Sequence, residues 1–490
     1  MSSVAVKAQS GAPSAFPRAL LPLSKAPIWA LQRHYFDRTG IAAWRGNIVP
    51  SYVTTNPFCA GTYAEMLRDL FAGQDGPVDV VELGAGSGRF AYALLTRLFE
   101  GEGPPPPLRY IMTDVSEANI AFWRAHPDFA RFIAAGRLDF ARFDVETGDE
   151  LVLQVSGRRL RPDAPAATLA VIANYVFDGT TQDLFAVAAG ELTELLVEAD
   201  GLPMPGAGRE GEDLEVPALA YRSMPCPPDR YADPAWNGLL ERYRKALGQG
   251  AFLLPGGALA CLSRLRRLSA GAFVTLTCDR GRTRLEDYEA EPPPQPLSHG
   301  SFSFEVNYDA LAGWTRASGG LALLPEAHAS IAVAALALGL DAAGERRLAE
   351  SYRRHVRTFG PDDFFVLKQA FDRDWETMNL RQLIAFLRLS AWDPTVFTIC
   401  YDGLVTRLAD ATVRERRTLT EGVKAMWKHY LHLGEDVDLA FRAGGLLAGL
   451  GAFADAIPFF ELSLKRHGKD PSTRKNLAYC RRRAAENGGC

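Results

Sequence analysis

One glycine-rich segment constrains the fold of this chain more than any other feature. From Val80 to Phe90 the sequence reads V-V-E-L-G-A-G-S-G-R-F, so an apolar run ends at Glu82 and a helical pattern begins near Arg89. The glycines between them alternate with other residues: Gly84, Gly86 and Gly88. Such glycines let the backbone turn tightly and approach a ligand. A dinucleotide site would need a glycine where Arg89 stands, so the segment predicts a strand–loop–helix ligand site of another kind.

Strands and helices alternate along the chain around this segment. Strands are expected at three further apolar runs: residues 109–115, 138–144 and 168–176. Helices are expected between them: residues 90–99 and 117–125. Apolar runs without polar alternation are typical of strands that are buried on both faces. The pattern therefore predicts a parallel α/β sheet, whose last strands are expected within residues 301–326.

Length and composition exclude several classes of protein. No apolar run reaches the ~18 residues that a membrane span needs, and the longest, residues 329–340, is expected to be a buried helix. The net charge of −4 argues against nucleic acid as a partner. The seven cysteines form no CxxC pair and no Cys/His cluster, so we expect free thiols in a reducing compartment and no metal site.

Local composition divides the chain into three parts. Residues 1–27 are rich in Pro and Ala and are expected to be a flexible leader. Residues 28–340 carry the strand–helix alternation, with residues 191–225 as an inserted hairpin and loop. Residues 341–490 lose the strand pattern and are expected to form an all-α domain. The basic start of the leader is shared with transit peptides, but its weak amphipathic pattern favours a cytoplasmic over a mitochondrial location.

The charges are distributed unevenly along the chain. Residues 1–36 contribute +4 and residues 465–490 contribute +6, which leaves −14 for residues 37–464. An acidic body attracts basic molecules, and salt weakens that attraction. The distribution favours a basic peptide or protein as substrate over an acidic metabolite.

The helical part contains a spacing of small and aromatic residues. Residues 436–471 include Gly444, Ala456 and Phe460 at offsets that resemble a tetratricopeptide repeat, in which small residues let two antiparallel helices approach. An ordinary helical bundle is the alternative. A repeat-like domain would offer a surface to a protein partner.

Carboxylates follow three successive strands. Glu82 ends the first, Asp114 the second and Asp144 the third. Together with the glycine loop, this order resembles class I S-adenosylmethionine-dependent methyltransferases. The resemblance implies a seven-stranded, Rossmann-like sheet with helices on both faces. It also implies that the glycines and Glu82 lie at the amino-acid end of the cofactor, Asp114 at the ribose and Asp144 at the adenine.

A narrower resemblance covers residues 28–335. The sequence A-N-Y-V-F-D at residues 173–178 resembles the fourth strand of the MidA-like group, which includes mitochondrial complex I assembly methyltransferases. Residues 53–57, V-T-T-N-P, resemble a segment that roofs the cofactor in that group, and this implies a cofactor role for Thr55. Residues 300–320 resemble its late strand–helix unit. The chain departs from the group at Tyr175, where the group usually has Glu.

Two polar residues at the fourth strand are the candidate catalytic residues. Open α/β sheets bind ligands at the carboxyl ends of their strands. The amide oxygen of Asn174 is suited to accept hydrogen bonds from an amine or guanidinium. Asp178 is suited to pair with a basic acceptor and take its proton, and a capping role in the following turn is its alternative.

The expected function is methyl transfer from S-adenosylmethionine to a protein or peptide side chain. Arginine is the acceptor that the family resemblance implies. Two alternatives remain open: a small-molecule methyltransferase, and a non-catalytic cofactor-binding scaffold that works through its helical domain. The sequence does not give the oligomeric state.

Overall fold

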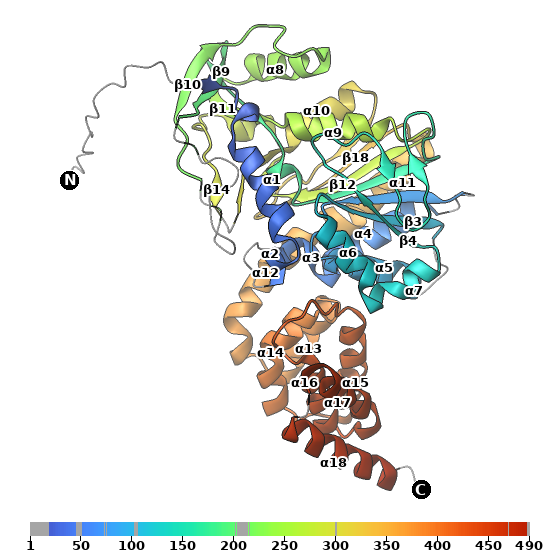
Figure 1. Ribbon diagram of the computed structural model, residues 1–490. Helices are drawn as coiled ribbons and strands as arrows, with labels where there is room; N and C mark the ends of the chain where they lie inside the picture. The colour runs from blue at the N-terminus through green and yellow to red at the C-terminus, as the bar shows by residue number, and fades with distance from the viewer. Residues whose placement is uncertain are drawn as a thin grey trace, which may run out of the picture.

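The computed structural model describes residues 19–45, 51–72, 74, 76–101, 106–200, 202, 214, 216–298, 301–468 and 470–487. A domain built on β-sheets lies above a domain of helices, and the described chain ends in the helical domain (Figure 1). Residues 1–18 of the expected leader lie outside the described residues. Within the described ranges, no helix has the length and apolarity that crossing a bilayer requires.

The central sheet has seven strands in the order β17-β18-β12-β7-β2-β3-β4. Their bounds are Val78–Leu83 (β2), Leu108–Asp114 (β3), Leu138–Arg142 (β4), Leu169–Asn174 (β7), Phe273–Asp279 (β12), Leu321–Leu323 (β17) and Ala332–Leu338 (β18). Strands β2, β3, β4, β7 and β12 pair in parallel, whereas β18 runs antiparallel to both of its neighbours. The predicted seven-stranded α/β sheet is therefore present.

The prediction for residues 329–340 was wrong, because this run contains strand β18 instead of a helix. All residues of Ala332–Leu338 are buried, and the strand pairs with β12 along its whole length. A run that is apolar at every position carries neither a helical nor a strand period, so pattern alone does not separate the two. The last strands accordingly extend beyond the expected limit of residue 326.

Helices cover both faces of the sheet. One core contains side chains of α4 (Pro57–Leu70), α5 (Arg89–Glu100), α6 (Glu117–Ala125) and α7 (Ala130–Ala134). The other contains side chains of α8 (Pro234–Ala246), α9 (Gly256–Arg266) and α10 (Tyr308–Ala317). Alternate residues of β2 enter the two cores, as expected for a strand between two layers of helices.

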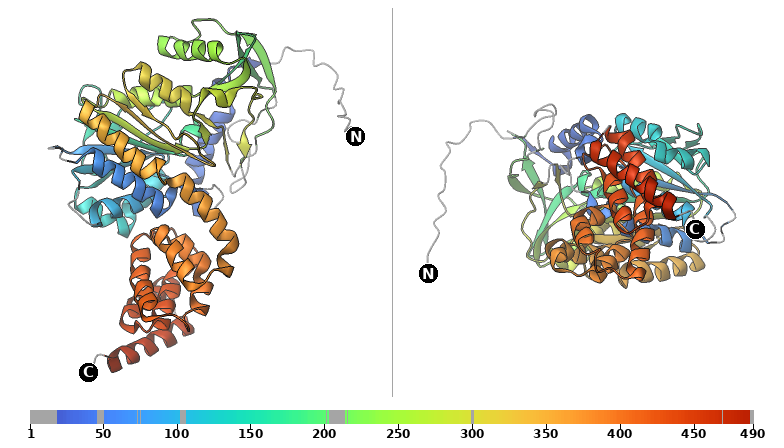
Figure 2. Two further views of the ribbon diagram at one scale, coloured as in Figure 1. Left: turned by 180° about the vertical axis from the view of Figure 1, so that it is seen from behind. Right: turned by 90° about the horizontal axis from the view of Figure 1, so that it is seen from below.

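A second sheet lies at the end of the molecule away from the helical domain (Figures 1 and 2). Its five strands are Leu20–Leu21 (β1), Asp183–Ala188 (β8), Glu191–Glu198 (β9), Tyr221–Pro225 (β10) and Gln249–Leu254 (β11). The expected inserted hairpin at residues 191–225 thus supplies two strands, β9 and β10, which pair with each other, and β9 also pairs with β1 and β8. Most of the loop expected after β9 lies outside the described residues.

The expected flexible leader ends earlier than residue 27. Strand β1 pairs with β9, and the turn η1 (Leu23–Lys25) follows it. Leu23, Ala26 and Ile28 are buried in the core of the second sheet together with Val197. Although this stretch is rich in Pro, it contains apolar side chains, and their burial favours an ordered structure. Composition alone did not reveal this order.

Several short elements complete the sheet-containing domain. The remaining helical turns are Ala42–Arg45 (α2), Tyr52–Thr55 (α3), Pro127–Phe129 (η2), Phe177–Gly179 (η3) and Leu285–Tyr288 (η4), and α1 (Ile28–Thr39) is a longer helix. Three small strand pairs join them: Leu151–Val152 with Arg159–Leu160 (β5, β6), Gly281–Arg282 with Val306–Asn307 (β13, β16), and Leu297–Ser298 with Phe302–Ser303 (β14, β15).

The first helix after residue 341 belongs to the sheet-containing domain. Helix α11 (Ala342–Tyr352) and the π-helix η5 (Arg353–Arg357) bury Leu348, Tyr352 and Val356 in the core beside the central sheet. A separate helical core starts only at Phe371. Helical periodicity predicts a helix but does not show which core its apolar face covers.

The remaining helices form the all-α part of the chain. They are Pro361–Asp374 (α12), Trp375–Thr377 (η6), Leu380–Leu389 (α13), Pro394–Thr406 (α14), Val413–Lys428 (α15), Leu439–Gly449 (α16), Phe453–His467 (α17) and Pro471–Asn487 (α18). At the contact of α16 and α17, a Cβ atom on Gly444 would lie 3.1 Å from the ring of Phe460. The small residue therefore allows the aromatic ring to pack against the backbone of α16.

Replacing Gly444 by Leu should destabilise the helical domain by about 1–3 kcal/mol, because the larger side chain has to displace the ring of Phe460. Urea unfolding followed by circular dichroism measures the change. Gly61 in α4 is the control, since a Cβ there meets no described atom within 4 Å. Gly61→Ala should be stabilising by about 0.5–1 kcal/mol. An unchanged unfolding midpoint for Gly444→Leu would show that α16 and α17 are not closely packed at this position.

Candidate functional site

A cavity of about 630 Å³ opens at the carboxyl ends of the parallel strands. Residues at or just after the ends of β2, β3, β4, β7 and β12 line it: Gly84, Asp114, Val115, Phe143, Asp144, Tyr175, Val176 and Arg280. Parallel pairing brings these strand ends to one edge of the sheet. The volume is within the range of sites for small ligands, about 300–1,000 Å³.

The glycine loop after β2 adopts a conformation that favours glycine. Gly84, Gly86 and Gly88 have φ of +58°, +52° and +75°. At Gly88, a Cβ atom would also lie 3.1 Å from the indole nitrogen of Trp123, so the position excludes larger side chains. The indole N–H of Trp123 donates to the carbonyl of Gly86 (3.2 Å) and fixes the loop from the α6 side.

Asp114 joins the end of β3 to the glycine loop. Its Oδ2 accepts the N–H of Gly86 (3.2 Å), and its Oδ1 accepts the N–H of Ser116 (3.0 Å). The carboxyl is buried and borders the cavity. Burial raises its pKa, and the two backbone N–H groups partly offset this effect. Each oxygen keeps lone pairs for further hydrogen bonds, such as those from a pair of hydroxyl groups.

Among the predicted cofactor residues, Glu82 has the most strongly shifted pKa. The side chain is 4% exposed, and its Oε2 has no hydrogen-bond partner among the described residues. Burial raises the pKa of Glu82 to about 8; the nearby hydroxyl of Tyr110 partly offsets this effect, and the charge of Asp114 adds to it. Glu82 is not among the residues that line the cavity, whereas the neighbouring Gly84 and Asp114 are. A buried carboxyl without a full set of partners is costly, so a ligand donor that reached this oxygen would be favoured.

Asp144 lies on the wall of the same cavity. It is partly exposed, and its Oδ1 accepts the N–H of Glu146 (2.8 Å). Glu146 is committed elsewhere, because it accepts the N–H (2.7 Å) and the hydroxyl (2.9 Å) of Thr181. Of the two carboxylates that follow β4, Asp144 is therefore the one that can still accept hydrogen bonds from a ligand.

The candidate catalytic residues differ in their surroundings. The amide oxygen of Asn174 accepts the hydroxyl hydrogen of Tyr63 (2.8 Å), and its Nδ2 has no partner within the described ranges. Asn174 does not line the cavity, whereas Tyr175 and Asp178 do. Tyr175 holds a left-handed backbone conformation with φ of +52°, which costs a side-chain-bearing residue about 1 kcal/mol or more.

Asp178 belongs to a pair of buried carboxyls. Its N–H donates to Asp279 Oδ2 (3.1 Å), and both side chains are 5% exposed or less. Burial raises the pKa of Asp178 to about 6, and Ser303 and Arg280 partly offset this effect. Burial and the charge of Asp178 raise the pKa of Asp279 well above its ordinary value. The shared burial of the two carboxyls therefore disfavours the state in which both are ionised.

Sequence reasoning missed several residues of the cavity. Gln32 and Arg33 come from α1, and Arg280 and Ser301 come from the segments after β12 and before β15. The Oγ of Ser301 and the Nε of Arg280 have no hydrogen-bond partner in the described part of the chain. Arg280 directly follows Asp279, the last residue of β12, so the strand-end rule could have found this position. No comparable signal marks α1.

Thr55 lies apart from the other predicted cofactor residues. Its hydroxyl donates to the carbonyl of Ser51 (2.9 Å) within the turn α3. It lines a second cavity of about 490 Å³, which lies between the sheet-containing and helical domains and is also bordered by Arg89 and Glu435. Val53, from the same segment, does line the first cavity. The expected roofing segment thus reaches the candidate site through Val53.

No family model and no curated protein matches the chain. Two solved structures from Burkholderia thailandensis show distant similarity, both with a TM-score of 0.41. An uncharacterized protein is 16% identical, and the match covers 66% of this chain and 89% of that one. A protein considered a methyl transferase, bound to S-adenosyl-homocysteine, is 18% identical over 62% of this chain and 74% of that one. These values are too low for either likeness to assign a function to this chain.

Replacing Glu82 by Gln should change how stability depends on pH. Because the pKa is raised from 4.5 to about 8, the folded protein holds a proton that the unfolded chain releases between these values. The contribution of Glu82 to stability is thus fully present below about pH 4.5 and falls by about 1.4 kcal/mol per pH unit up to about pH 8, and the variant should lack this part of the slope. Urea unfolding at pH 5 and pH 8 tests it. Parallel pH profiles of the two proteins would contradict a protonated Glu82.

Proposed function

We propose that this protein transfers a methyl group from S-adenosylmethionine to a side chain of a protein or peptide. The observation that carries the proposal is the buried, unpartnered oxygen of Glu82 beside Asp114 and the glycine loop. These groups meet at the carboxyl edge of a seven-stranded sheet that is consistent with the class I methyltransferase fold.

The residues in and beside the cavity fit the parts of this cofactor. Glu82 offers an acceptor to the amino group, and Asp114 retains lone pairs for the two ribose hydroxyls. Asp144 is suited to the adenine amino group. Our proposal includes the narrower MidA-like relationship and these cofactor roles of Glu82, Asp114 and Asp144.

The cofactor supplies an activated methyl group, so the protein has to position the acceptor and manage its proton. The nucleophile of the acceptor forms a bond to the methyl carbon while the carbon–sulfur bond breaks. Holding the reactants in line can supply about 7–11 kcal/mol. Asp178 borders the cavity and has a pKa of about 6, so its carboxylate is suited to take the proton that the acceptor loses.

Charge supports a basic acceptor such as arginine. The body of the chain, residues 37–464, carries −14. Five carboxylates line the cavity against two guanidinium groups: Asp114, Asp144, Glu146, Asp178 and Glu305 against Arg33 and Arg280. Tyr175 supplies a phenol where the MidA-like group usually has a carboxylate, so Asp178 is the main negative group for the acceptor.

The proposal also includes a partner and a location. A protein partner would bind the helical domain. A cytoplasmic location fits the free thiols of the described cysteines.

Gly86→Arg should abolish cofactor binding while the protein stays folded, because a long side chain on the loop would occupy the cofactor's position. Isothermal titration calorimetry with S-adenosylmethionine measures binding, and circular dichroism reports folding. Gly157→Arg is the matched control, since Gly157 also has positive φ (+72°) but meets no described atom within 4 Å. The control should bind as the wild type does. If Gly86→Arg binds S-adenosylmethionine normally, the cofactor site does not lie at the glycine loop. If the wild type does not bind it, methyl transfer from this cofactor is refuted.

Asp178→Asn should slow methyl transfer by about 100-fold or more while cofactor affinity is retained, because the variant lacks the proton acceptor. The assay incubates protein, methyl-labelled cofactor and cell lysate, then follows label in proteins by mass spectrometry. Label confined to small molecules would refute a protein acceptor and support a small-molecule methyltransferase. Cofactor binding without any transfer would support a scaffold. An undiminished rate for the variant would remove Asp178 from the mechanism.

A further inference from the structure

Residues 430–435, here called the interdomain segment, connect the two domains. The segment follows α15 of the helical domain, yet Leu431 and Leu433 are 2% and 0% exposed and belong to the core beside the central sheet. That core also contains side chains of α5 and α6. The segment therefore packs as a part of the sheet-containing domain, although the chain on both sides of it belongs to the helical core.

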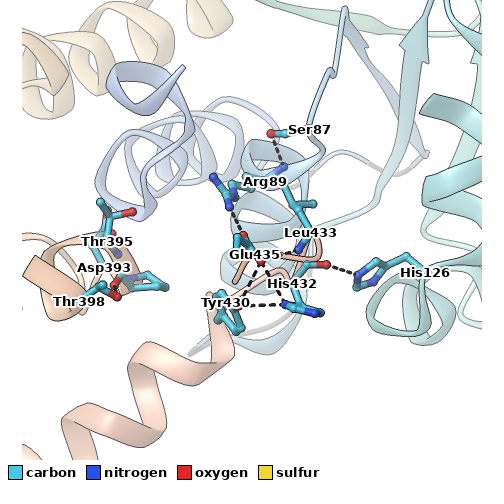
Figure 3. Close-up of polar contacts among 11 residues, drawn as sticks. Ser87, Arg89, His126, Asp393, Thr395, Thr398, Tyr430, His432, Leu433 and Glu435 are labelled. Carbon is cyan, nitrogen blue, oxygen red and sulfur yellow. Dashed lines mark hydrogen bonds and ion pairs between the residues drawn. The ribbon is translucent and has the colours of Figure 1, made fainter. Parts of the chain in front are cut away.

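An ion pair joins the interdomain segment to the start of α5. Arg89 is the first residue of that helix and directly follows Gly88 of the glycine loop. Its Nη2 pairs with Oε1 of Glu435 (Figure 3). The backbone N–H of Arg89 also donates to the hydroxyl of Ser87 (3.3 Å). Both the main chain and the side chain of Arg89 are therefore fixed at the point where the loop becomes a helix.

Glu435 is held in place by its own segment. Its Oε2 accepts the N–H of Leu433 (2.9 Å) and the hydroxyl of Tyr430 (3.2 Å), and it lies 3.1 Å from Nδ1 of His432 (Figure 3). Burial opposes ionisation, but the charge of Arg89 and the backbone N–H groups hold the pKa of Glu435 below its ordinary value. The carboxylate is thus charged at neutral pH and set in a fixed orientation toward α5.

A second contact fixes the segment against α6. The Nε2 of His126, at the end of α6, lies 2.9 Å from the carbonyl oxygen of His432. Helix α6 also carries Trp123, whose indole N–H donates to the carbonyl of Gly86. The two helices that hold the glycine loop are therefore both in contact with one segment of six residues.

We propose that Glu435 is a positioning residue for the glycine loop, so that the interdomain segment sets the affinity of the candidate site. Arg89 and Glu435 line the second cavity and not the first, so they act through the backbone at the start of α5. Loss of the ion pair leaves the first turn of α5 and the loop free to move. The identity of the ligand in this inference rests on the proposed function.

Glu435→Gln is the primary test. Two quantities are measured: the Kd of S-adenosylhomocysteine by calorimetry, and hydrogen exchange at the backbone amides of residues 84–92 in the protein without ligand. We expect binding about 5- to 50-fold weaker, in the range of ordinary coupling between sites. We also expect faster exchange in the loop and first turn of α5. Thermal unfolding checks that the variant is folded.

Glu415→Gln is the matched control within the helical domain. Glu415 pairs with Arg381 (3.2 Å) and accepts the N–H of Thr412 (2.8 Å), and its side chain is 15% exposed against 18% for Glu435. It is thus a carboxylate of similar side-chain exposure with the same kinds of partner, although Arg381 is more exposed than Arg89, and it makes no contact to the sheet-containing domain in any described interaction. Glu415→Gln should leave both the Kd and the exchange of residues 84–92 unchanged.

Arg89 supplies the rescue experiment. Arg89→Met should reproduce the effects of Glu435→Gln, whereas Arg89→Lys keeps the charge and should restore most of the affinity and slow exchange. Wild-type affinity and exchange in Glu435→Gln would overturn the inference and leave the proposed function intact. If the wild type does not bind the ligand, the proposed function fails, and hydrogen exchange still decides the positioning role. If Glu415→Gln changes the Kd and the exchange of residues 84–92 as much as Glu435→Gln does, then Glu435 contributes only to general stability and the inference is overturned.

Discussion

Parallel hydrogen bonding of β2 to β3 and β7 is the constraint on which the rest of this structure depends. It aligns the carboxyl ends of these strands at one edge of the sheet. The turns that follow the strands therefore lie close together at that edge. The turn after β2 is tight enough to require left-handed φ at three glycines. The turns after the neighbouring strands then place Asp114, Asp144 and Asp178 around one cavity.

Much of this edge was predictable because it follows from local rules. An apolar run followed by an acidic residue marks a strand end, and this rule located Glu82 and Asp114 without any knowledge of the rest of the fold. Residues that reach the cavity from other elements carry no such mark: Gln32 enters from a helix that is distant in sequence, and Thr55 was assigned to the site but lies in the second cavity. Strand β18 was misassigned because a uniformly apolar segment has no period.

Counts of charged residues overstate the charge around the cavity. The sequence shows an acidic body, yet burial raises the pKa of Glu82 and of Asp279, which lie beside residues that line the cavity. The cavity keeps its acceptor capacity mainly through Asp114, Asp144 and Asp178, which face it from three different strands. An acidic composition therefore steers a basic molecule toward the surface, whereas the buried carboxyls discriminate among hydrogen-bond donors at close range.

The burial of Leu431 and Leu433 in the core beside the central sheet bears on how the chain is made. Domains generally fold from the N-terminus as the ribosome releases them. Here the last side chains of the sheet-containing core emerge after α12 to α15, roughly 90 residues behind strand β18. The nascent chain must keep that apolar site open, or cover it temporarily, until most of the helical domain has been synthesised. The domain that carries the candidate site is thus completed only after α15 has left the ribosome.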